Sequence, residues 1–162
     1  MTTESPEQSC VRIGLGELHI GSEPMVCIGI GSCVALIIHD RERSIGGMAH
    51  VMLPSSGANN GKPGKYADTA VNAILSSFGD RVSKNGNLLA KIAGGACMFN
   101  TFSHRLNIGE RNIECIKTNL QKHRLKLVAE DTGGTCGRTI YYYPEKNGRV
   151  FVRRADGSTL TL

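Results

Sequence analysis

Apolar residues gather along this chain mainly in short runs bounded by glycine, proline or charged residues. Two of these runs, at residues 25–38 and 45–53, are separated only by a charged turn at residues 39–43, and Pro54 ends the second run. Short apolar runs bounded in this way are typical of strands. The pattern therefore predicts two neighbouring strands joined by a hairpin-like return.

Two other segments repeat their apolar residues every three or four positions, which is the spacing of one helix face. The first helix is predicted over residues 66–78 and the second over residues 109–123. Basic side chains at residues 122–124 suit the C-terminal end of the second helix, because the helix dipole is negative there. The inward-facing residues expected in the second helix are Ile113, Ile116 and Leu120.

The remaining patterned segments predict further strands and two tails. The strands are expected at residues 11–20, 88–93, 125–130, 139–143 and 148–153. The pair Asn147-Gly148 is a strong hairpin signal between the last two. Polar residues 1–10 and 157–162 predict terminal tails. The expected fold is mixed α/β: a single domain, residues 11–156, forms a layered sandwich of a mixed sheet and two main helices.

Composition excludes several classes of protein. No apolar run approaches the roughly 18 residues that a membrane-spanning helix needs, and the polar N-terminus lacks the features of a signal peptide. A cytoplasmic protein without membrane insertion is therefore expected, and its 6 cysteines are expected to be reduced. The cysteines form no C-x-x-C pair, so the spacing predicts no metal site and leaves only one assembled from distant segments.

The formal net charge of +5 favours an acidic partner, either nucleic acid or an acidic protein surface. The basic residues are spread along the chain and are not interleaved with aromatic residues, as single-strand binding modules require. A solvated surface accounts for them, and nucleic acid stays a rival that only the charge suggests.

Each of the two neighbouring apolar runs carries one residue suited to covalent chemistry, Cys33 in the first and His50 in the second. A thiol becomes a strong nucleophile when a nearby imidazole takes its proton. Backbone N–H groups at Gly31 and Ser32, just before the cysteine, are candidates to hold an oxyanion. The alternative is that Cys33 and His50 belong to the core, because free cysteine is among the most buried residue types.

Substrate contacts are predicted at four more residues. Lys65 and Tyr66 follow a polar loop that begins shortly after His50, and such loops often bind substrates. Gly94 and Gly95 interrupt a strand pattern, which indicates a bulge or a close approach to the backbone. The alternatives are that Tyr66 only starts the helix and that the glycine pair only permits a bulge.

Six ordered segments resemble a known protein family. They are GIGSCV (29–34), GGMAHVMLP (46–54), GKYADTAV (64–71), KIAGGACMF (91–99), NIGERN (107–112) and AEDTGGTCGRT (129–139). In this order and at this spacing the chain resembles the chemoreceptor glutamine deamidase family, CheD, over about residues 11–154.

The resemblance implies a hydrolase that converts particular glutamine side chains of chemotaxis receptors to glutamate. It implies a catalytic cysteine at Cys33 and a catalytic histidine at His50, with acyl transfer through a thioester and no cofactor. The implied fold is that of toxin-type Cys/His deamidases. The implied partners are the cytoplasmic helices of the receptors and a CheC-type phosphatase. The alternative function is a non-catalytic regulatory module that binds receptors or CheC.

The chain departs from the family pattern at Cys27, where the family usually has a threonine that counts as a third catalytic residue. A thiol is a weaker hydrogen-bond acceptor than a hydroxyl, so Cys27 would orient His50 less firmly. A backbone carbonyl can also hold an imidazole in one tautomer. The alternative for Cys27 is a buried core thiol.

Overall fold

The computed structural model describes residues 9–84, 86–98 and 107–162, and the strands in these ranges form two five-stranded sheets. Sheet A has the strand order β1-β3-β8-β9-β10, and sheet B has the order β2-β5-β4-β6-β7. Sheet A consists of β1 (Val11–Arg12), β3 (Met25–Ile30), β8 (Arg138–Tyr143), β9 (Arg149–Arg154) and β10 (Thr159–Thr161). Sheet B consists of β2 (Leu18–Gly21), β5 (Ile45–Val51), β4 (Val34–Asp40), β6 (Leu88–Gly94) and β7 (Lys126–Thr132).

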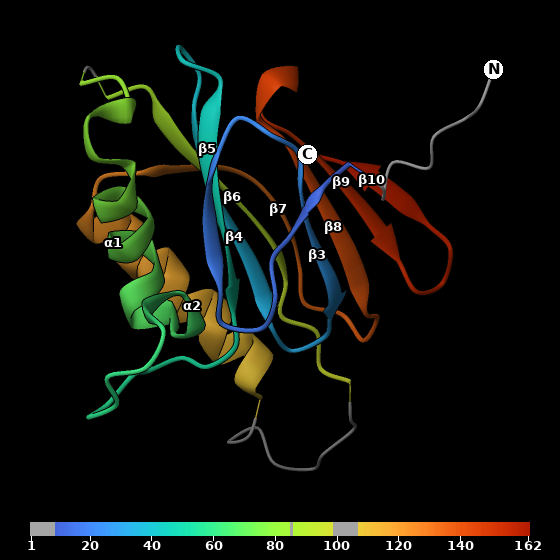
Figure 1. Cartoon of the computed structure of the whole chain (residues 1–162). Coiled ribbons are helices and arrows are strands. Elements are labelled where there is room, and N and C mark those ends of the chain that lie inside the picture. The colour runs from blue at the N-terminus through green and yellow to red at the C-terminus, as the bar shows by residue number, and fades with distance from the viewer. Residues whose placement is uncertain (1–8, 85, 99–106) are drawn as a thin grey trace, which may run out of the picture.

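The helices α1 (Ala67–Phe78) and α2 (Ile108–Lys122) lie on one face of sheet B, and sheet A lies on the other face (Figure 1). Short 3₁₀ turns add the segments Pro63–Lys65, Gly79–Arg81 and Pro144–Lys146. The predicted mixed α/β class and its two main helices are confirmed. The sequence predicted one sheet, whereas the structure has two. Across the described ranges, no helix has the length and apolar character needed to cross a membrane.

Strand β4 is the centre of the molecule, because every one of its residues is buried. Successive side chains of a strand point to opposite faces. Val34, Leu36 and Ile38 pack against the helices, whereas Ala35 and Ile37 pack into the layer between the two sheets. Burial on both faces explains why the sequence of β4 is a nearly continuous apolar run.

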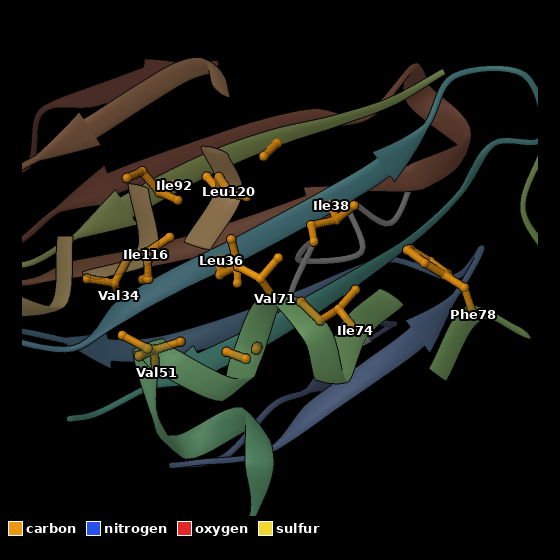
Figure 2. Packing of buried hydrophobic residues seen from close by; sticks show 14 residues of the cluster. Val34, Leu36, Ile38, Val51, Val71, Ile74, Phe78, Ile92, Ile116 and Leu120 are labelled. Carbon is orange, nitrogen blue, oxygen red and sulfur yellow. The ribbon is translucent and has the colours of Figure 1, made fainter. Parts of the chain in front are cut away.

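The core between sheet B and the helices is built from one face of each helix (Figure 2). Val71 and Ile74 of α1 and Ile116 and Leu120 of α2 are at most 1% exposed, as their helical spacing predicted. The side chain of Asn107 caps the start of α2 by accepting a hydrogen bond from the Glu110 N–H. Satisfying such an end group fixes where the helix begins.

Two predicted strands prove to be pairs of strands in different sheets. Residues 11–20 divide into β1 of sheet A and β2 of sheet B, and Gly16 lies between them with a φ of 75°. Residues 25–38 divide into β3 of sheet A and β4 of sheet B, with residues 31–33 as the crossing. Glycine adopts such positive φ angles readily, so the chain can leave one sheet and enter the other.

The predicted C-terminal tail at residues 157–162 is wrong in its middle, because Thr159–Thr161 form β10. Leu160 pairs with Val152 of β9, and Leu160 and Leu162 pack against the cluster between the sheets. Two leucines in alternation are enough to bury one face of this short strand. The predicted N-terminal tail, residues 1–10, lies mostly outside the described residues.

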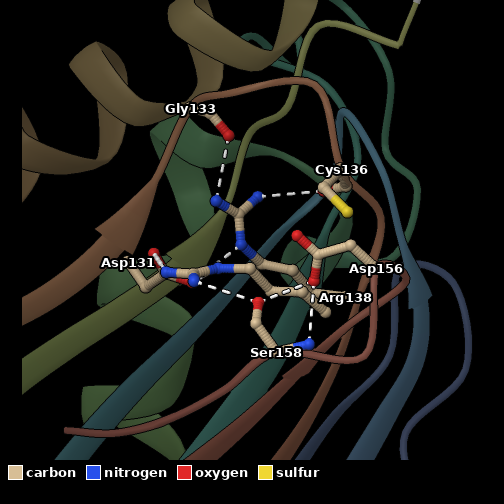
Figure 3. Close-up of polar contacts among 7 residues, drawn as sticks. Asp131, Gly133, Cys136, Arg138, Asp156 and Ser158 are labelled. Carbon is tan, nitrogen blue, oxygen red and sulfur yellow. Dashed lines mark hydrogen bonds and ion pairs between the residues drawn. The ribbon is translucent and has the colours of Figure 1, made fainter.

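A buried group of ion pairs joins the two sheets near the end of β7 (Figure 3). Asp131 of β7 in sheet B accepts from Arg138 Nε of β8 at 2.9 Å and from Arg154 Nη2 of β9 at 2.8 Å. The same Arg138 donates to the Gly133 carbonyl at 2.9 Å, and the Gly133 N–H donates to the Gly94 carbonyl at 2.9 Å. Residues from the 129–139 motif therefore fix sheet A against sheet B and against the end of β6.

Candidate active site

Cys33 lies at the point where the chain crosses from sheet A to sheet B. It directly precedes β4 and is partly buried. Two hydrogen bonds hold this crossing against the end of β6: Gly95 N–H donates to the Cys33 carbonyl at 2.7 Å, and Ala96 N–H donates to the Gly31 carbonyl at 2.9 Å. The thiol is thus carried by a backbone segment with fixed neighbours.

His50 lies on β5, directly opposite Ala35 of β4. Residues that are directly opposite each other on paired strands point to the same face, so His50 shares a face with Ala35. This face is the one directed at sheet A, since Ala35 packs into the cluster between the sheets. The hairpin expected from the sequence is confirmed. Cys33 directly precedes β4 and packs against the cluster that contains Ala35. Its pairing with His50 stays a prediction.

The His50 ring is held by a backbone carbonyl. Its Nδ1 lies 3.3 Å from the Ile13 carbonyl oxygen, which can only accept, so Nδ1 carries the proton. Its Nε2 is buried and has no hydrogen-bond partner in the described part of the chain. Burial lowers the pKa of His50, against the opposing effects of the Ile13 hydrogen bond and of Glu17. A neutral ring with a free lone pair at Nε2 is a competent base.

Cys33 is protonated at rest. Burial raises the pKa of the Cys33 thiol above its ordinary value of 9.0, and only a hydrogen bond with its own backbone amide opposes this shift. With the pKa of His50 lowered as well, both the Cys33 thiol and the His50 imidazole are neutral in the resting state. The arrangement therefore suits proton transfer during attack rather than a preformed thiolate.

The crossing also offers backbone donors. Within the described ranges, the N–H groups of Gly31 and Ser32 donate to no backbone carbonyl, whereas the Cys33 N–H is hydrogen-bonded with its own thiol. Unpaired N–H groups on a fixed segment beside a nucleophile can bind a developing oxyanion. Gly31 and Ser32 are the residues that the sequence analysis proposed for this role.

Cys27 lies in the layer between the sheets and is completely buried. Burial strongly raises the pKa of its thiol, and the nearby Cys33 raises it further. The hydrogen bond that orients His50 comes from Ile13 instead. The structure therefore fits the alternative in which a backbone carbonyl orients the His50 ring. It also fits the alternative in which Cys27 is a buried core thiol.

A cavity of about 210 Å³ reaches the His50 ring from outside. A water molecule takes up about 30 Å³ in the liquid, so a side-chain carboxamide fits this space. Cys33 is not among the residues around this cavity, and it packs at the edge of the neighbouring cluster. A larger groove of about 460 Å³ lies between α2 and β7, far from both residues along the fold. The residues around the smaller cavity are Arg12, Ile13, Gly14, Leu15, Val26, Ile28 and His50.

The predicted substrate contacts have structural partners. The Lys65 carbonyl accepts from the Met52 N–H at 2.8 Å, and Tyr66 is 4% exposed with its carbonyl accepting from the Ala70 N–H at 2.9 Å. Both residues therefore anchor the segment that follows His50. Their contact with substrate stays a prediction.

Gly94 and Gly95 end β6 rather than forming a bulge inside it, and both have positive φ angles. A Cβ added at Gly94 would lie 2.4 Å from the Cys33 carbonyl oxygen, and one added at Gly95 would lie 2.4 Å from Ile113 Cδ1. The expected close approach to the backbone is confirmed, and the approaching groups are the Cys33 crossing and α2. A bulge does occur in β3, between Cys27 and Ile30, where none was expected.

Two contributors to this site were missed by the sequence analysis. The Ile13 carbonyl has no residue-type signal, because any residue supplies a carbonyl. Asn112 is fully buried inside the 107–112 motif, and a polar residue on the inward face of an apolar helix pattern was the signal available. In the described part of the chain no group of three His, Cys, Asp or Glu residues is arranged to hold a metal ion.

Comparison with known proteins supplies the family. A family model described as CheD chemotactic sensory transduction matches residues 52–154. The chemoreceptor glutamine deamidase CheD of Thermotoga maritima is 46% identical over 147 residues, which cover 90% of this chain and 92% of that protein. The chain belongs to the CheD family. The match to the Thermotoga CheD leaves only about a tenth of this chain outside, so it includes residues 33 and 50.

Other CheD proteins agree over similar lengths. The probable chemoreceptor glutamine deamidase CheD of Symbiobacterium thermophilum is 45% identical over 86% of this chain and 89% of that protein. The one from Archaeoglobus fulgidus is 38% identical over 94% of this chain and 98% of that protein. The family resemblance stated from the six motifs is therefore confirmed over most of the chain.

Proposed function

We propose that this CheD protein is a cysteine-dependent amidohydrolase that converts particular glutamine side chains of chemotaxis receptors to glutamate. The names of its relatives support the activity. The observation that carries the mechanism is the His50 ring, whose tautomer is fixed by the Ile13 carbonyl and whose Nε2 has no hydrogen-bond partner in the described ranges. Ala35, which is opposite His50 on β4, lies in the cluster against which Cys33 packs.

The first half of the reaction forms a thioester. His50 Nε2 takes the proton of the Cys33 thiol as the sulfur attacks the carbon of the glutamine carboxamide. The backbone N–H groups of Gly31 and Ser32 hold the tetrahedral oxyanion. The imidazolium then returns its proton to the amide nitrogen, the C–N bond breaks, and ammonia leaves.

The second half releases the product. His50 takes a proton from water, the resulting hydroxide attacks the thioester carbonyl, and the C–S bond breaks. The proton returns to the Cys33 sulfur, and the substrate leaves as glutamate. The sum is one amide plus one water giving one acid plus ammonia, with no electron transfer and no need for a cofactor.

The partners follow from this reaction. The cytoplasmic helices of receptors carry the glutamines, and this protein therefore works in the cytoplasm. A net charge of +5 favours an acidic partner surface. The family resemblance also implies a CheC-type phosphatase as a binding partner, which co-purification of the two purified proteins tests directly.

Mass spectrometry of a receptor cytoplasmic fragment incubated with the protein tests the activity. Exchange of an amide for an acid adds about one dalton at each modified glutamine, with an equal amount of ammonia released. Cys33→Ala and His50→Ala should abolish both signals while the proteins stay folded. Cys136→Ala is the matched control, since Cys136 is also a partly buried free cysteine. Full ammonia release by Cys33→Ala would rule out the covalent route.

A non-catalytic module that binds receptors or CheC is the second candidate, favoured by the partial burial of Cys33. Alkylation separates the two functions. An enzyme should show iodoacetamide modification at Cys33 that His50→Ala slows strongly. A binding module should show slow modification that does not depend on His50.

A further inference from the structure

Asn112 of α2 connects the two segments that carry Cys33 and His50. Its amide nitrogen donates to the Ser32 carbonyl at 3.1 Å and to the Met52 carbonyl at 3.0 Å. Ser32 directly precedes Cys33, and Met52 follows the end of β5, two residues after His50. A single side-chain amide has two N–H donors, so this one spends both on the two segments.

The position of these bonds follows from the β4–β5 ladder. The last pair of that ladder is Val34 with Val51. Continued by one more step, the register would set Cys33 opposite Met52, but there the Met52 N–H turns away to the Lys65 carbonyl at 2.8 Å. The amide of Asn112 thus bridges the two strands at the point where their own pairing stops.

The helix that carries Asn112 is itself fixed against the Cys33 crossing. A Cβ added at Gly109 would lie 2.5 Å from the Gly95 carbonyl oxygen, so α2 touches the segment whose N–H groups hold Gly31 and Cys33. Asn112 is about one helical turn further along the same helix. This close backbone contact therefore fixes the position from which the Asn112 side chain extends.

Burying the Asn112 amide destabilises the fold, so core packing alone does not explain why this residue is here. Asn112 is 0% exposed, and its Oδ1 has no hydrogen-bond partner among the described residues. A buried polar atom without a partner destabilises a fold, and an apolar residue on this helix face would avoid the loss. The two donated bonds are what the amide adds and an apolar side chain lacks.

We propose that Asn112 is a positioning residue for the cysteine–histidine pair. Its forked amide sets the separation between the Cys33 crossing and the end of the strand that carries His50. It touches neither the substrate nor the reacting atoms and acts through the backbone at Ser32 and Met52. This inference rests on the proposed function, because it assigns Asn112 to the same reaction.

Asn112→Ala removes both donors and tests the inference. A misplacement of about 1 Å can cost about 100-fold in rate, so kcat for ammonia release should fall by about that factor. KM should change little, because Asn112 does not contact the substrate. Iodoacetamide modification of Cys33 should lose its dependence on His50, shown by equal rates in Asn112→Ala and in Asn112→Ala/His50→Ala.

Asn119→Ala is the matched control. Asn119 is on the same helix, and its amide donates to the Cys115 carbonyl at 2.9 Å, within α2 itself. It should lose some stability and keep kcat. If Asn112→Ala lowers the unfolding midpoint but keeps kcat and the His50 dependence, Asn112 is only a core residue and the inference is overturned. If Asn112→Ala does not fold, Asn112→Leu, which has the same branching at Cγ and no hydrogen-bond donor, carries the same test.

The two proposals fail differently. If the wild-type protein releases no ammonia from receptor fragments, the proposed function fails. The alkylation rates of Cys33 in the four proteins (wild type, Asn112→Ala, His50→Ala and the double variant) still report whether Asn112 couples the two residues.

Discussion

Substituting Gly94 by alanine tests whether the end of β6 sets the position of Cys33, the proposed nucleophile. The φ angle of Gly94 is 123°, where a residue with a side chain is strained by about 1–3 kcal/mol. The new Cβ would also lie 2.4 Å from the Cys33 carbonyl oxygen and 2.5 Å from Ile30 Cγ2, whereas ordinary contact begins at 3.4 Å. The crossing must therefore move by about 1 Å, which costs a further 1–3 kcal/mol or so as overpacking.

The expected result for Gly94→Ala is a loss of about 2–6 kcal/mol in the free energy of unfolding, measured with urea. Because Cys33 moves by about 1 Å, kcat for ammonia release should also fall about 100-fold. Gly157→Ala is the control: Gly157 has a φ of 88° and nothing within 4 Å of its added Cβ, so it carries strain without collision. Equal stability losses in the two variants, with full activity in Gly94→Ala, would refute the claim that β6 positions Cys33.

Three further predictions concern the protonation of the pair, the ion pairs between the sheets and the buried thiol. Because burial lowers the pKa of His50 and raises that of Cys33, the acidic limb of the pH profile of kcat/KM should lie below pH 6.5, and a thiolate absorbance signal at neutral pH would contradict this. Asp131→Ala should lower the free energy of unfolding by about 3–5 kcal/mol, because it leaves the buried Arg138 without its carboxylate, and urea denaturation measures the loss. Burial alone would raise the pKa of Asp131, but the arginine hydrogen bonds outweigh it and lower the pKa below 3.8, so this stabilisation is present above pH 3.8 and is lost as the pH falls through the lowered value. Cys27→Thr should keep or raise kcat, since the Ile13 carbonyl orients His50, and a large loss of kcat would mean that a hydroxyl cannot pack in that buried place.

Local patterns predicted the elements that depend on near neighbours. The helix face of α1 and the Asn147-Gly148 hairpin each follow from residues a few positions apart. The β4–β5 hairpin was predictable for the same reason, since register within a hairpin is set by its turn. The sequence therefore placed Cys33 at the start of this hairpin and His50 on its second strand. The turn between β4 and β5 was predicted too early, at residues 39–43, because His39 and Asp40 are the buried end of β4.

The elements that the sequence left unresolved depend on distant contacts. An apolar run such as residues 25–38 does not state that its first half joins β8 in sheet A and its second half joins β5 and β6 in sheet B. Residues 159–161 are polar enough for a tail, and only the open edge of β9 makes them a strand. Hydrogen-bond partners of this kind become visible only when segments far apart in the chain are packed together.

The sequence alone identified the family and the candidate groups for the proposed chemistry: the Cys33 thiol, the His50 imidazole and the amides of Gly31 and Ser32. Only the tertiary structure decided how these groups are held. The Ile13 carbonyl accepts from the His50 ring, and the Asn112 amide donates to the carbonyls of Ser32 and Met52. The close approach of Gly94 to the Cys33 carbonyl fixes the crossing against β6. The physical reason is that reactivity belongs to a side chain, whereas its orientation comes from backbone groups that every residue possesses and that no residue type announces.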